Sequence, residues 1–260
     1  MIVSTEINSV NLACWVNSEK VAERRRALVF IHGSGADHRI WIKQYTKFQD
    51  TFTVAVIDLP GHGQSGGNGE QEVSSYVEWV RQFLDARTVK KPVLIGHSLG
   101  AAISLLFAIH YGELLSGIVA VGGGATMPVN EMILKGIKTD PDAVIALAAK
   151  FSVSKENRER LSRTVIEGLS RANSDVLYGD FLACDRLDIR DGISRINIPT
   201  LIICGKNDKM MPPEFSQFLQ DTIPSAQLSL IENAGHMVML ENPELFNRSL
   251  REFLESLPLV

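Results

Sequence analysis

The feature that most constrains the fold of this chain is a regular alternation of two kinds of segment. Short runs rich in branched aliphatic residues are each followed by a longer segment whose apolar residues recur at helical spacing. Most of the short runs are almost wholly apolar, which is typical of parallel strands that helices cover on both faces. They comprise residues 27–32, 53–58, 92–96, 117–121, 200–204 and 227–231. The alternation predicts an α/β fold with a mostly parallel central sheet and helices on both of its faces.

Two predicted helices carry clear signals, and a hairpin precedes the alternation. Apolar side chains recur every three or four residues in segment 73–84 and again in segment 246–257. The second of these helices has Asn242 in the N-cap position, followed by a proline at the first helical position. Residues 2–7 and 12–16 are expected to pair as an antiparallel hairpin.

One long interval, residues 126–196, interrupts the alternation. It contains helical segments separated by polar stretches, and it has no convincing strand. The helical segments lie at 132–137, 143–151 and 158–169. Because so small a unit has too little core of its own, we interpret it as a helical insertion mounted on the sheet. The α/β core is then expected to comprise residues 1–125 and 197–260.

Composition excludes several classes of protein and partner. With 26 Lys and Arg against 30 Asp and Glu the net charge is −4, so nucleic acid is not an expected partner. The basic triplet at residues 24–26 is interpreted as a solvated turn. Three cysteines without a CxxC pair or metal-ligand spacing favour a reducing compartment. Since neither a secretory signal nor an apolar run of about 20 residues is found, we expect a cytoplasmic protein without a membrane span.

The strongest chemical motif is Gly96-His97-Ser98-Leu99-Gly100, which fits the pattern G-x-S-x-G. It stands where the apolar run at 93–95 meets the predicted helix at 101–109. A serine on such a turn is held in a strained backbone conformation, and glycines on either side let strand and helix pack closely. The positive end of the helix points at the serine and favours negative charge there. This setting favours a nucleophilic role for Ser98.

Together with four further motifs, this turn makes the chain resemble the α/β-hydrolase superfamily over nearly its whole length. In chain order those motifs are His32-Gly33-Ser34-Gly35, Asp58-Leu59-Pro60-Gly61-His62-Gly63-Gln64-Ser65, Gly205-Lys206-Asn207-Asp208 and Asn233-Ala234-Gly235-His236. In that family the nucleophile, the acid and the base follow in the order Ser, Asp or Glu, His. A helical insertion before the acid-bearing strand forms a cap over the active site. The resemblance therefore implies that residues 126–196 are such a cap.

A serine hydroxyl needs a base within hydrogen-bond reach, and a neutral imidazole needs a carboxylate to hold its other N–H. The expected catalytic residues are Ser98 as nucleophile, His236 as base and Asp208 as the acid that orients His236. A helix-capping role before Pro212 remains open for Asp208. The other place where relatives carry the acid, residues 122–125, has no carboxylate here.

The oxyanion formed by attack on a carbonyl must meet backbone N–H donors that are already in place. The N–H of Leu99 is one expected donor, and the resemblance implies the N–H of Ser34 as the second. His32 is expected to hold the loop that carries Ser34 rather than to act as a second base.

No metal and no cofactor are expected. His38, His62 and His110 have no carboxylate or cysteine at metal-ligand spacing in the sequence. Residues 61–66 fit G-x-G-x-x-G, but a polar loop follows them, where a dinucleotide site requires a helix that begins at once.

The expected function is that of a serine hydrolase that cleaves carboxylic esters of small-molecule acyl substrates through an acyl-enzyme, with esters favoured over amides by resemblance alone. The alternatives are a C–C bond hydrolase, a cofactor-free perhydrolase or haloperoxidase on the same triad, and a catalytically slow ligand receptor. Six apolar residues of the insertion are candidates for an acyl pocket: Met127, Met132, Ile133, Phe151, Phe181 and Leu182. The natural substrate and the oligomeric state are left open.

Overall fold

The computed structural model describes residues 1–18 and 26–258, so Arg24 and Arg25 of the basic triplet lie outside the described residues. Eight strands form one sheet in the order β1-β2-β4-β3-β5-β6-β7-β8. They are β1 (Ile2–Ile7), β2 (Val10–Val16), β3 (Ala27–Ile31), β4 (Thr53–Ile57), β5 (Val93–His97), β6 (Gly117–Val121), β7 (Thr200–Gly205) and β8 (Ala226–Ile231). Strands β3 to β8 are parallel, and β1 and β2 pair antiparallel at one edge. The predicted α/β fold, its strands and its hairpin are therefore confirmed.

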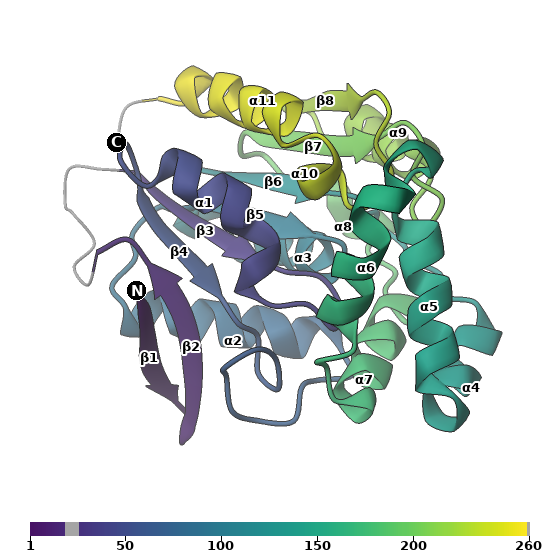
Figure 1. Ribbon diagram of the computed structural model, residues 1–260. Coiled ribbons are helices and arrows are strands. Elements are labelled where there is room, and N and C mark those ends of the chain that lie inside the picture. Colours follow the sequence, from purple (N-terminus) through teal and green to yellow (C-terminus); the bar gives the residue numbers. More distant parts are fainter. Residues whose placement is uncertain (19–25, 259–260) are drawn as a thin grey trace.

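Helices cover both faces of this sheet (Figure 1). They are α1 (Ile42–Phe48), α2 (Val73–Ala86), α3 (Leu99–Tyr111), α4 (Glu131–Thr139), α5 (Pro141–Ser152), α6 (Arg158–Leu169), α7 (Ser174–Asp185), α8 (Arg190–Ile193), α9 (Pro213–Thr222), α10 (Val238–Glu241) and α11 (Pro243–Ser256). Single 3-10 turns are η1 (His38–Trp41), η2 (Gly112–Leu114) and η3 (Lys155–Asn157).

Alternate side chains of the strands enter two separate cores. In β3, Val29 and Ile31 pack on the face covered by α2 and α3, while Leu28 and Phe30 pack on the face covered by α1 and α11. This alternation follows from the two-residue period of a strand. It explains why the inner strands β3 to β7 are almost wholly apolar and buried along their whole length, since both of their faces lie under helices.

The structure confirms the apolar face predicted for α2 and the N-cap predicted for α11. The apolar face predicted for segment 73–84 is buried along α2. Asn242 caps α11 by accepting a hydrogen bond from the N–H of Leu245 at 3.2 Å. Its side chain thereby pairs one of the backbone donors that a helix leaves free at its start.

Helices α4 to α8 occupy the interval between β6 and β7, and four of them, α4 to α7, gather where the parallel strands end (Figure 1). The predicted helical segments appear as α4, α5 and α6. Helix α7 lacks a helical period in its sequence because both of its sides are buried, against the sheet-bound core and against α4 and α5. No helix within the described residues is long and apolar enough to cross a membrane.

Replacing Asn242 with Ala should lower the free energy of unfolding by about 1 kcal/mol, because the N–H of Leu245 loses its acceptor. Urea unfolding followed by circular dichroism measures this change. Asn242→Asp keeps an acceptor at the helix start and should stay close to the parent protein. Equal losses in both variants would contradict a capping role.

Candidate active site

Ser98 occupies a sharp turn between β5 and α3. Its backbone has φ 53° and ψ −115°, a conformation that residues with side chains rarely adopt. The Ser98 N–H donates to the carbonyl of Val121 at 2.8 Å, and the Ser98 carbonyl accepts from the N–H of Ala101 at 2.9 Å. The strained residue is thus held from both sides, by strand β6 and by the first turn of α3.

The two glycines of the motif are required by close packing. A Cβ at Gly96 would lie 1.9 Å from the carbonyl oxygen of Gly100. A Cβ at Gly100 would lie 2.4 Å from the carbonyl oxygen of Ile31. Any side chain at either position would collide with backbone, so the turn that presents Ser98 depends on both glycines.

Asp208 and His236, which are 28 positions apart, meet in the fold. Oδ2 of Asp208 lies 2.8 Å from Nδ1 of His236, and the two residues are only 4% and 3% exposed. The other carboxylate oxygen accepts the N–H groups of Met210 and Met211, each at 2.9 Å. With the carboxylate accepting at Nδ1, Nε2 of His236 is left as the free acceptor.

The helix-capping alternative for Asp208 is wrong. The N-cap residue of α9 is Pro212, and no side chain caps that helix.

Glycine at position 122 makes room for the Asp208–His236 pair. A Cβ at Gly122 would lie 3.1 Å from Nδ1 of His236 and 3.4 Å from Oδ2 of Asp208. A side chain at position 122 would crowd this pair, so the loop after β6 has no carboxylate there and the acid stands after β7.

Ser98 and His236 line one cavity of about 300 Å³. Gly33 and Ser34 line it as well, whereas Leu99 contributes no surface and its side chain is buried. Ser98 and His236 are not hydrogen-bonded to each other within the described residues. Such pairs are often longer before substrate binds than in the reacting complex. The cavity lies between the ends of the parallel strands and helices α5, α6 and α7.

The loop after β3 passes directly over Ser98. A Cβ at Gly33 would lie 3.0 Å from Cβ of Ser98, so glycine permits this approach. The N–H of Ser34 and the N–H of Leu99 donate to no acceptor among the described residues. Two unengaged backbone donors are what a developing oxyanion requires.

His32 holds this loop, as predicted. Its Nδ1 lies 2.8 Å from the carbonyl oxygen of Gly33, and its Nε2 accepts the N–H of Leu59 at 3.0 Å. Burial, together with the nearby His62, lowers the pKa of His32 to about 4. The ring is therefore neutral near pH 7, and each of its nitrogens has a backbone partner.

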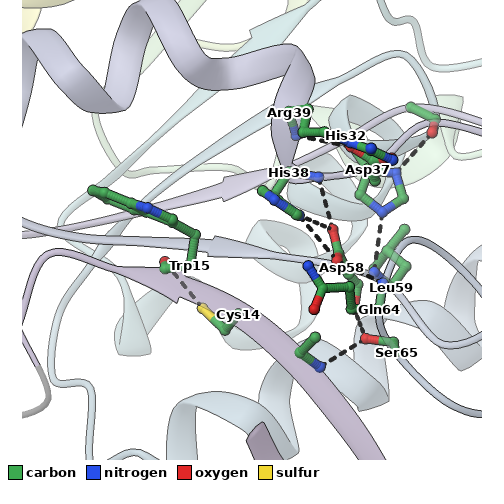
Figure 2. A network of polar contacts seen from close by, with 12 residues as sticks. Cys14, Trp15, His32, Asp37, His38, Arg39, Asp58, Leu59, Gln64 and Ser65 are labelled. Carbon is green, nitrogen blue, oxygen red and sulfur yellow. Dashed lines mark hydrogen bonds and ion pairs between the residues drawn. The ribbon is translucent and has the colours of Figure 1, made fainter. Parts of the chain in front are cut away.

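A second network lies beside this loop and involves three residues whose ligand atoms are within 4.8 Å of one another: Asp37, His38 and Asp58 (Figure 2). Asp58 accepts the backbone N–H of His38 at 2.7 Å and faces its Nδ1 at 2.9 Å. Asp37 is engaged by the guanidinium of Arg39. A metal ion would have to displace these contacts, which instead tie the loops after β3 and β4 together. The carboxylate of Asp58 reaches His38 from 20 positions away, a contact that spacing in the sequence does not reveal.

Asp180, on α7, forms a buried network that the sequence did not predict. Its Oδ2 accepts the N–H of Gly35 at 2.9 Å and lies 2.8 Å from Nε2 of His62. Its Oδ1 accepts the hydroxyl of Tyr76 at 2.6 Å. One carboxylate thus links α7, the loop that carries Ser34 and the start of α2. An aspartate within an otherwise apolar stretch was the only sequence signal for it.

His62 has an acceptor at each ring nitrogen, since its Nδ1 lies 3.0 Å from the carbonyl oxygen of Pro60. Burial lowers the pKa of His62, but the charge of Asp180 and the hydrogen bond to it outweigh burial and leave that pKa above its ordinary value. The arrangement favours a His62 imidazolium paired with the Asp180 carboxylate.

His97 supports His236 rather than Ser98. Its Nε2 donates to the carbonyl of His236 at 3.0 Å, and the two ring centroids are 4.7 Å apart. Burial, with a further contribution from His236, holds the pKa of His97 well below its ordinary value. A neutral imidazole therefore packs behind His236.

The matched family model, described as the alpha/beta hydrolase family, spans residues 28–249. The chain belongs to the alpha/beta hydrolase family. It is 30% identical over 254 residues to Protein ABHD8 of Mus musculus, covering 92% of this chain but only 57% of that relative's length. It is 22% identical to the pimeloyl-[acyl-carrier protein] methyl ester esterase of Vibrio cholerae, over 90% of this chain and 96% of that protein. A solved structure of a thermophilic esterase superposes with a TM-score of 0.82 at 30% identity, over 98% of this chain and 97% of that one.

The apolar wall of the cavity differs from the one predicted. Of the six candidates only Phe181 lines the cavity among the described residues. Met132 is 79% exposed, and Met127 belongs to the core on the face of the sheet that α2 and α3 cover. Besides Phe181, the larger apolar side chains that residues 126–196 contribute to the cavity wall are Leu161, Val165 and Leu169, with Ala148 beside them. Sequence identifies apolar residues but does not reveal which side of a short helix faces the sheet.

The His62–Asp180 pair should make stability depend on pH. A folded-state pKa above the unfolded value contributes stability that is fully present below the unfolded pKa of about 6.5 and is lost as pH rises through the folded pKa. The difference in unfolding free energy between the parent protein and His62→Gln should therefore shrink from pH 6 to pH 9. Urea titrations at both pH values measure it. A difference that grows with pH would contradict the assignment.

Proposed function

We propose that this chain is a serine hydrolase that cleaves carboxylic esters through an acyl-enzyme intermediate. Ser98 is the nucleophile, His236 the general base and Asp208 the acid that orients His236. The observation that carries the proposal is the Asp208–His236 contact of 2.8 Å beside the cavity that Ser98 lines from its strained turn. A buried carboxylate on Nδ1 leaves Nε2 as the base that a serine hydroxyl needs.

The steps follow from these positions. Oγ of Ser98 attacks the acyl carbon while Nε2 of His236 takes its proton, and the carbonyl oxygen becomes an oxyanion bound by the N–H groups of Ser34 and Leu99. The intermediate collapses as His236 returns the proton to the departing alcohol. A water molecule then attacks the acyl-enzyme while His236 takes its proton, and His236 gives that proton to Oγ of Ser98 as the carboxylic acid is released. Every proton is moved by His236, so the scheme uses no metal or cofactor.

Esters are favoured over other acyl substrates by the similarity to proteins that are named as esterases. The mostly apolar cavity wall suits the carbon chain of a small acyl substrate. We further propose that residues 126–196 act as a cap on a core of residues 1–125 and 197–260. Support comes from α5, α6 and α7, which all contribute side chains to the wall of the cavity.

Loss of either Ser98 or His236 should abolish turnover. Ser98→Ala and His236→Ala should each lower kcat for a short nitrophenyl ester by a factor on the order of 10⁶. Both variants should also fail to react with a fluorophosphonate probe. Ser116→Ala is the matched control, because its hydroxyl bonds to the carbonyl of Lys91 outside the cavity. Stoichiometric binding of ligand with negligible turnover in the parent protein would point instead to the receptor alternative.

Replacing Asp208 with Asn separates orientation of His236 from packing. The Asn side-chain oxygen still accepts the N–H groups of Met210 and Met211, but its NH₂ group faces Nδ1 and favours the wrong tautomer of His236. We expect kcat to fall by about 10⁴. Stopped-flow ester hydrolysis measures kcat, and unchanged thermal unfolding would show that the fold is intact. A kcat within tenfold of the parent value would remove Asp208 from the mechanism.

A further inference from the structure

The charged side chains that line the cavity are mostly cationic. Besides the histidines they are one carboxylate, Asp37, and four cations, Arg39, Lys43, Arg160 and Arg171. Four positive charges less one negative leave the wall with a net charge of +3, in a chain whose net charge is −4. The cations therefore do not follow from a general excess of basic residues.

The single carboxylate neutralises one of these cations. The guanidinium of Arg39 donates to Asp37 through Nε at 2.8 Å, and its terminal nitrogen contacts the other oxygen. Lys43, Arg160 and Arg171 form no ion pair with any carboxylate among the described residues. Three positive charges at the cavity thus have no carboxylate partner in the part of the chain that the structure describes.

Arg160 is held in place without being neutralised. Its guanidinium donates to the carbonyl of Glu241 at 2.9 Å and to the side-chain oxygen of Asn157 at 2.8 Å. These partners orient the group but leave its formal charge. On the same helix, Arg163 is paired with Glu167 at 2.8 Å and does not line the cavity. Arg160 therefore differs from Arg163 both in lacking a carboxylate partner and in lining the cavity.

The rest of the cavity wall contributed by the insertion and its neighbours is largely apolar. It includes Ile40, Leu161, Val165, Leu169, Phe181 and Leu240. A wall that combines apolar surface with uncompensated positive charge is complementary to a molecule with a carbon chain and a negative group. Positive charge in a cleft also raises the local concentration of anions and speeds their association.

We propose that the esters hydrolysed at this site carry an anionic group, a carboxylate or a phosphate, away from the scissile bond, and that Lys43, Arg160 and Arg171 bind it. This inference rests on the proposed ester hydrolysis at Ser98. The anion lies either on the acyl chain or on the alcohol, and both positions place it beyond the reacting carbon.

Two pairs of substrates test the proposal and separate these positions. Monomethyl suberate carries a carboxylate on the acyl side, and methyl 8-amino-8-oxooctanoate is its neutral counterpart. Octanoyl glycerol phosphate carries a phosphate on the alcohol side, and octanoyl glycerol is its neutral counterpart. In at least one pair, kcat/KM for the anionic member should exceed that of the neutral member about tenfold or more in low salt. The preference should shrink in 0.5 M NaCl, where the screening length falls to about 4 Å.

Single substitutions assign the effect to residues. Lys43→Gln, Arg160→Gln and Arg171→Gln should each reduce the ratio of anionic to neutral kcat/KM about two- to fivefold, mainly through KM. Arg163→Gln, which changes a cation of α6 outside the cavity, should leave the ratio unchanged. Equal rates for both members of both pairs, or a preference that all three variants retain, would overturn the proposal.

Binding to the Ser98→Ala variant gives a readout that does not require turnover. Isothermal titration should show tighter binding of the preferred anionic ester than of its neutral counterpart, and Arg160→Gln added to Ser98→Ala should weaken it. If neutral esters are cleaved in a Ser98-dependent way with no charge preference in rate or binding, only this inference fails. If no ester is cleaved but the anionic compound still binds through these cations, the proposed function fails and the anion site stands.

Discussion

The whole site depends on how closely β5 and α3 approach each other at the turn that carries Ser98. A Cβ at position 96 would lie only 1.9 Å from the carbonyl oxygen of Gly100, so no side chain fits there. Ser98 takes φ 53°, and the surrounding hydrogen bonds hold it there. The parallel sheet supplies the rigidity that this strained residue requires, because β5, which leads into the turn, is buried along its whole length.

The remaining parts of the site follow from the ends of neighbouring strands. Parallel strands end at the same edge, so loops after β3, β5, β7 and β8 converge although they are distant in sequence. The bare backbone at Gly122, after β6, leaves space that the Asp208–His236 pair needs. The acid stands after β7, and it fits against His236 because residue 122, after β6, has no side chain.

Sequence predicted those features that depend on local pattern. The strand periods, the cap at Asn242 and the turn at Ser98 each leave a signal within a few residues. What could not be predicted depends on contacts between distant segments. Asp58 reaches His38, and Asp180 reaches His62, only once the chain has folded. Helix α7 shows no helical period in its sequence because it is buried on both sides. The cavity-facing side of α5 and α6 is set by packing in the same way.

The three hydrogen bonds of Asp180 also constrain how a substrate reaches the cavity. Moving α7 away from the sheet would break its bonds to Gly35, His62 and Tyr76 together, and would displace the loop beside Ser34. Helix α7 is thus held in a fixed position relative to the sheet. The connection between α5 and α6 is anchored too, because the buried carboxylate of Glu241 accepts the N–H of Ser154 at 2.9 Å and the N–H of Gly235, next to His236, at 2.8 Å. A movement that opens the cavity on either side would therefore also disturb the loops that carry Ser34 and His236.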